Sequence, residues 1–108
     1  MREIKIGEKT VRLRATPPAL LFYRQEFKAD LIGDLISFQK ISEDPSAFDS
    51  VALLQMIWAM AKADNYNQFP SFITWVGQLD SFDFGDADLL RDVIEEATAG
   101  FFRGSNPR

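Results

Sequence analysis

The segment from Val51 to Asp64, which reads VALLQMIWAMAKAD, constrains the fold of this chain more than any other segment. Apolar residues follow one another there with almost no polar face between them. A helix that is apolar on nearly all sides belongs in the core of a globular protein. We therefore predict that this segment is the central helix and that Trp58 anchors the core. It contains no plausible catalytic group.

The length and composition describe one ordinary globular domain. The chain has 108 residues, of which 46% are hydrophobic and 26% are charged. A chain of this length is expected to form one domain, and this balance argues against disorder. We predict a single globular domain over residues 1–103 and a flexible polar tail over residues 104–108, which are rich in helix-breaking residues.

Residues 1–15 have the pattern of a β-hairpin. Ile4 and Ile6 alternate with charged residues, and Val11 and Leu13 do the same after a turn at residues 7–9. This period of two gives each strand one apolar face. A hairpin alone is marginally stable in water, so its apolar face is expected to lie on helices. The charged outer face is interpreted as protection of the sheet edge, and contact with an acidic partner is the alternative.

From Pro17 onward the apolar period becomes helical. Capping residues, prolines and apolar spacing predict helices over about 17–27, 31–38, 45–61, 69–79 and 86–102. Thr16, Asp30 and Asp44 are the expected N-caps of the first three. The predicted fold class is mainly α, within α+β, with an N-terminal β-hairpin packed on a bundle of about five helices.

Several kinds of chemistry are disfavoured by residues that the chain lacks. It has no cysteine, which removes disulfides and zinc–thiolate sites, and no histidine, the commonest general base. Nucleophilic catalysis by a serine would therefore need another base. We expect no enzyme activity, no catalytic residue, no metal and no cofactor.

Three apparent motifs do not change that expectation. The triplet Asp83-Phe84-Gly85 matches a kinase metal-binding motif, but the chain has no glycine-rich loop to accompany it. The aspartates between Asp80 and Asp88 lack the ligand spacing of an EF-hand. Glu95 and Glu96 are adjacent, so a helix turns them about 100° apart and they do not converge on one substrate.

Charge is unevenly distributed along the chain. Residues 1–14 hold five basic and two acidic side chains, and residues 80–96 hold seven acidic side chains against Arg91. One interpretation is that both clusters are solvated faces, and the other is end-to-end complementarity between protomers. A net charge of −4 disfavours nucleic-acid binding.

The same sequence gives no indication of a membrane segment. No apolar run reaches the length of about 18 residues that a membrane-spanning helix needs. The charged N-terminus is not followed by the apolar stretch of a signal peptide. We expect a cytoplasmic protein with no membrane partner.

Aromatic residues gather in the last forty positions, and the chain has ten phenylalanines in all. Most of them are expected to pack the core. Adjacent rings such as Phe101 and Phe102 cannot both point inward from one helix, so some aromatic surface should be exposed or covered by a partner. The candidate partner-binding residues are Phe69, Phe72, Trp75, Phe101 and Phe102.

Four features together resemble the tail assembly chaperones of long-tailed bacteriophages and prophages. They are the hairpin REIKIGEKTVRLR, a helix that opens at Pro-Pro, a helix that ends in WAMAKAD, and the block FPSFITWVGQLD. The resemblance spans residues 2 to about 102. It implies a non-catalytic protein that coats the tape-measure protein before the tail tube polymerises and recruits tail-tube subunits.

Other functions stay open from the residues alone. A client chaperone would benefit from self-association along the client, and the two charged ends could support it. A small helical adaptor or regulator, such as an antitoxin-like protein, would fit the same pattern. An enzyme would require a carboxylate site that the motifs do not reveal.

Overall fold

The computed structural model describes residues 2–7, 9–39, 50–65, 69–79, 81–82 and 86–102. The described elements are β1 (Arg2–Ile6), β2 (Lys9–Leu13), α1 (Pro17–Phe27), α2 (Leu31–Gln39), α3 (Ser50–Asp64), α4 (Phe72–Gly77) and α5 (Ala87–Phe101). This confirms the predicted class, a β-hairpin packed on helices. The expected cap and start of the third helix at residues 44–49, and the tail at 104–108, lie outside the described residues. No helix in the described part is long and apolar enough to cross a membrane.

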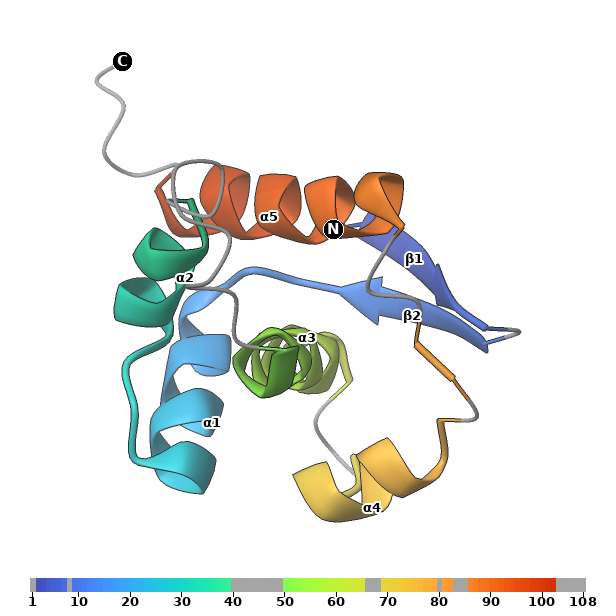
Figure 1. Ribbon diagram of the computed structural model, residues 1–108. Helices are drawn as coiled ribbons and strands as arrows, with labels where there is room; N and C mark the ends of the chain where they lie inside the picture. The colour runs from blue at the N-terminus through green and yellow to red at the C-terminus, as the bar shows by residue number, and fades with distance from the viewer. Residues whose placement is uncertain are drawn as a thin grey trace.

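Helix α3 occupies the centre of the molecule, as predicted. Figure 1 shows α1, α4 and the hairpin around it, with β2 beside α3 and β1 beside α5. Nine of its fifteen residues are buried, and Trp58 is 1% exposed. Burial on several sides explains why the segment has almost no polar face.

The hairpin is a two-stranded antiparallel sheet whose apolar face covers α3 and α5. Ile4 pairs with Val11, and Ile6 pairs with Lys9. Strand β2 therefore begins at Lys9, which the sequence analysis assigned to the turn. Gly7 has a φ of 63°, which glycine adopts without the steric cost of a side chain. Ile4, Ile6 and Val11 are all buried. The expected apolar face is confirmed.

The expected break between the first two helices is confirmed. Lys28 adopts a left-handed conformation with a φ of 56°, and its backbone N–H donates to the carbonyl oxygen of Arg24. This pattern ends α1 in the manner of an αL cap. Asp30 then accepts a hydrogen bond from the backbone N–H of Ile32 at 3.3 Å, so it caps α2.

Two other helix starts differ from the prediction. Thr16 stands at the N-cap position of α1, but its side chain makes no capping hydrogen bond. Pro17 and Pro18 occupy the first positions of that helix, and they leave fewer N–H groups to satisfy. Helix α4 begins later than expected, because Ser71 caps it through the N–H of Thr74 at 3.4 Å.

Candidate protein-binding site

Three rings from three helices meet at one point, which we call the aromatic junction: Phe27 of α1, Trp58 of α3 and Phe72 of α4. Their centroids lie 4.9 to 6.1 Å apart, and each pair meets edge to face. This geometry is the preferred one for aromatic pairs. The indole N–H of Trp58 also donates to the carbonyl oxygen of Pro70 at 3.1 Å, which ties α3 to the start of α4.

The apolar surface continues from the junction to solvent along α3. Val51, Leu54 and Trp58 fall at spacings of three and four, so they lie within about 60° of one another around the helix. Trp58 is buried, Leu54 is half-buried and Val51 is 53% exposed. Lys62 lies one helical turn after Trp58, and its ammonium is 5.0 Å from the Trp58 ring centroid. The apolar stripe therefore ends at a positive charge on this side.

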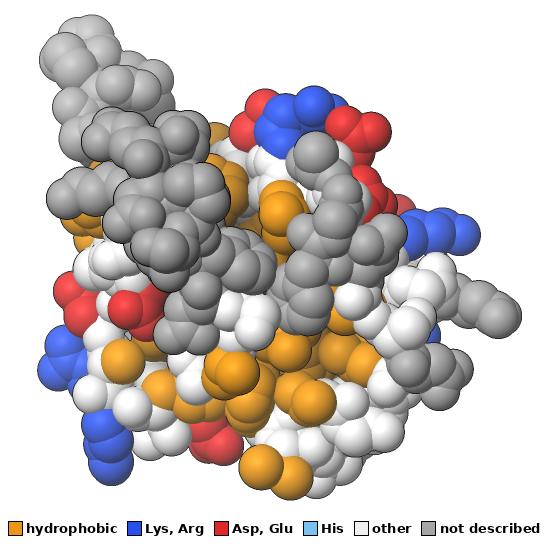
Figure 2. Space-filling model, viewed as in Figure 1, with side chains coloured by type: hydrophobic (Ala, Val, Ile, Leu, Met, Phe, Trp, Pro, Cys, Tyr) orange, Lys and Arg blue, Asp and Glu red, His pale blue; other side chains and the backbone are white. Residues whose placement is uncertain are grey.

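On α4 the next residue after Phe72 is also exposed. Ile73 is 78% exposed, the largest fraction among the exposed large hydrophobic residues of the described chain. Figure 2 shows hydrophobic side chains gathered in the lower half of this face, over α1, α3 and α4. We call Val51, Leu54, Ile73 and the half-buried rings Phe27 and Phe72 the apolar patch.

A second feature is an open groove of about 410 Å³ between β2 and α4. Its strand side is Lys9 to Arg12, and its floor is the end of α3. Phe69, Pro70, Trp75 and Gln78 form the opposite side. The groove therefore combines a strand edge, apolar rings and positive charge.

The structure divides the five predicted partner-binding residues among three places. Phe72 belongs to the aromatic junction, and Phe69 and Trp75 line the groove. Phe101 and Phe102 lie at the end of α5, on the opposite side of α3 from α4 (Figure 1). Trp75 is only 6% exposed, and the other four rings are half-buried.

The assignment of these five rings to a partner surface stays a prediction: four of them keep part of their surface in solvent, and Trp75 is buried. Among the described residues, the large hydrophobic side chains that are exposed are all aliphatic: Leu21, Ile36, Val51 and Ile73. Each of them lies in a segment that the sequence predicts to be helical. One signal was present for Leu21, because it belongs to the run Leu20-Leu21-Phe22-Tyr23, and four consecutive positions of a helix cannot all face inward.

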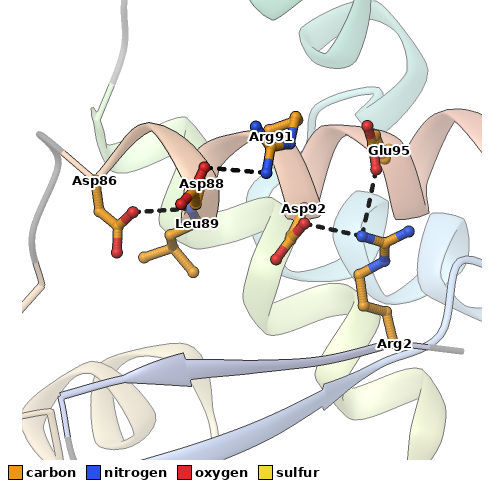
Figure 3. Close-up of polar contacts among 7 residues, drawn as sticks. All are labelled: Arg2, Asp86, Asp88, Leu89, Arg91, Asp92 and Glu95. Carbon is orange, nitrogen blue, oxygen red and sulfur yellow. Dashed lines mark hydrogen bonds and ion pairs between the residues drawn. The ribbon is translucent and has the colours of Figure 1, made fainter.

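The acidic run of α5 is used largely within the chain. Arg2 of β1 lies between Asp92 and Glu95, at 2.9 and 3.3 Å, and Asp88 pairs with Arg91 at 3.0 Å (Figure 3). Asp86 accepts from the backbone N–H of Leu89 at 3.1 Å and caps the helix.

The remaining carboxylate of the run, Glu96, is buried and accepts from the backbone N–H of Ala15 at 3.2 Å. Every described acidic residue of positions 80–96 thus has a partner in its own chain. For Asp92 and Glu95 that partner is Arg2, which belongs to the basic N-terminal cluster. These contacts weaken the charge basis for end-to-end pairing between protomers. Among the residues with described positions, no cluster of three or more acidic side chains could hold a metal ion.

Comparisons of this chain with models of protein families, with curated proteins and with solved structures find no match. Its function is therefore inferred from the surfaces of the chain itself and from the resemblance described above.

Proposed function

We propose that this chain is a non-catalytic tail assembly chaperone that binds the tape-measure protein of a long-tailed phage or prophage in the bacterial cytoplasm. The observation that supports this proposal best is the apolar patch. Val51 on α3 and Ile73, which follows Phe72 of the aromatic junction, both expose aliphatic side chains. Exposed apolar surface of this kind usually marks a protein interface.

The patch suits a helical client with one apolar face. Amphipathic helices dock by placing side chains spaced three and four residues apart on such surfaces. Here the rings of Phe27 and Phe72 form a fixed base, because the buried Trp58 holds both. Aliphatic side chains around that base make no directional contacts, so they can accept many client sequences along one long protein.

The resemblance also implies that the tail-tube protein is a second partner and that several copies coat one client. Self-association along the client would raise the local concentration of each copy. The charge pairing between Arg2 and α5 lies within one chain, so we place the contact between copies elsewhere than on these charged ends.

Co-expression with the tape-measure protein of the same phage or prophage tests the proposal. The wild-type chain is expected to keep that client soluble. The double variant Val51→Asp, Ile73→Asp is expected to weaken binding by at least about tenfold, because two apolar contacts are each replaced by a charge that must be desolvated. The soluble fraction of the client, read on a gel after centrifugation, is the measurement.

Both substituted positions are exposed, so the variant should fold, and its unfolding curve checks this. The matched control is Ile36→Asp on α2, which lies on the side of α1 away from α4 (Figure 1) and should leave client solubility unchanged. If the wild-type chain leaves the solubility of the client unchanged, the chaperone assignment is refuted. Binding of unrelated proteins through the same patch would favour the adaptor instead.

A further inference from the structure

We propose that the groove between β2 and α4 is a second binding site, which takes an extended acidic segment of a partner protein as a third strand beside β2. This site is separate from the apolar patch, and the inference does not depend on the proposed function. It rests on three properties of the groove: a strand edge with no backbone partner among the described residues, an apolar opposite side, and an excess of positive charge.

The first property follows from the register of the hairpin. Ile6 pairs with Lys9 and Ile4 pairs with Val11 across a connection of two residues. In such a ladder the pair next to the turn exchanges both hydrogen bonds, and the following pair does not. The N–H and C=O groups of Thr10 and Arg12 therefore point away from β1. Between described residues, no backbone hydrogen bond engages either of them.

The second property is the character of the groove opposite this edge. Phe69, Pro70 and Trp75 face β2 across the open space. An added strand presents alternate side chains to opposite faces, so every second side chain of a bound segment would turn toward these rings. Main-chain hydrogen bonds to β2 would give affinity, and the apolar contacts would give register.

The third property is charge. Arg12 and Arg14 both lie 3.4 Å from the carboxylate of Asp64, so two cations share one anion. Lys5 and Lys9 are also exposed on the hairpin. The acidic residue of its two strands is Glu3. The excess of cations favours an acidic segment over a basic one.

The same charge disfavours a second copy of this chain as the occupant. Pairing of β2 with another β2 would bring Lys9, Arg12 and Arg14 of both copies together. Like charges on adjacent strands destabilise the pairing. Edge strands that avoid pairing with themselves commonly carry such cations. A partner segment of opposite charge removes this repulsion.

The test uses a short capped peptide that alternates glutamate with valine, titrated into the full isotope-labelled chain and followed by NMR. Binding is expected to shift the amide signals of Thr10 and Arg12 and to slow their hydrogen exchange. A peptide with lysine in place of glutamate should bind at least about tenfold more weakly. A glutamate peptide that is N-methylated at alternate nitrogens should also lose binding, because it lacks the donors for one strand edge.

Two pairs of variants locate the site. Thr10→Pro removes an edge N–H and should weaken binding about tenfold, whereas Thr10→Val keeps that N–H and should bind as the wild type does. Arg12→Glu should weaken binding, and Arg91→Glu, the same charge change on α5, should not. If Thr10→Pro does not fold, the N-methylated peptide still tests strand addition to the wild type.

Equal affinity for the glutamate and lysine peptides would overturn the proposal. So would binding of the N-methylated peptide with unchanged affinity, because no strand could then have formed. Protection of the Thr10 and Arg12 amides in the chain alone, together with a dimer mass in sedimentation, would show that a second copy covers the edge and would also overturn it.

Discussion

Replacing Trp58 with alanine is expected to cost about 3–5 kcal/mol of unfolding free energy, because a large ring leaves a buried site that cannot collapse. Trp58 is 1% exposed, contacts the rings of Phe27 and Phe72, and donates its N–H to Pro70. A domain of this size has a stability of about 5–15 kcal/mol, so this loss is a large part of the total. Urea denaturation followed by far-ultraviolet circular dichroism measures the change.

The matched variant is Trp58→Phe, which keeps a ring and removes the N–H donor to Pro70. Its expected cost is about 1–3 kcal/mol, from the unpaired carbonyl oxygen and the smaller ring. Trp75 remains in both variants as a fluorescent reporter of unfolding. A Trp58→Ala protein within about 1 kcal/mol of the wild type would contradict the central place of this ring.

The second large effect is expected at Gly100, in the last turn of α5. A Cβ atom at this position would overlap the carbonyl oxygen and the Cβ of Ala15. Ala15 is held there by its N–H bond to Glu96, one helical turn before Gly100. Gly100→Ala should therefore destabilise the protein by about 1–3 kcal/mol through overpacking, although alanine favours a helix by about 1 kcal/mol over glycine.

Gly77, the last residue of α4, is the matched control for this substitution. A Cβ there would meet nothing within 4 Å. Gly77→Ala should be neutral or stabilise the protein by up to about 1 kcal/mol, because alanine loses less backbone entropy on folding. Thermal unfolding of the two variants beside the wild type checks the opposite signs. Equal shifts in the same direction would show that α5 does not approach Ala15 so closely.

Local patterns were sufficient to predict most of the fold. The helical period of α3, the alternation of the hairpin and the cap at Asp30 each depend on residues within a few positions of one another. The contact of Gly100 and Glu96 with Ala15 joins residues more than eighty positions apart. This contact depends on the tertiary arrangement, which no local period encodes.

The candidate site was predicted less completely. Aromatic rings gain the most from burial because of their large area. Phe72 therefore packs in the junction and Trp75 lines the groove, whereas the exposed large hydrophobic residues are aliphatic. Helical spacing gives the direction in which Val51 or Ile73 points. It does not show whether a neighbouring helix packs over that side chain. The groove beside β2 likewise depends on where α4 lies relative to the hairpin.

Site-specific photo-crosslinking in cells that express the tape-measure protein tests the chaperone proposal most directly. A benzophenone amino acid at position 73 replaces an exposed side chain of the apolar patch, and one at position 91 replaces the exposed Arg91 on α5. We expect the probe at position 73 to form a covalent product with the tape-measure protein and the probe at position 91 to form none. A product from position 91 alone, or none from either while the client stays soluble with this chain, would contradict binding through the patch.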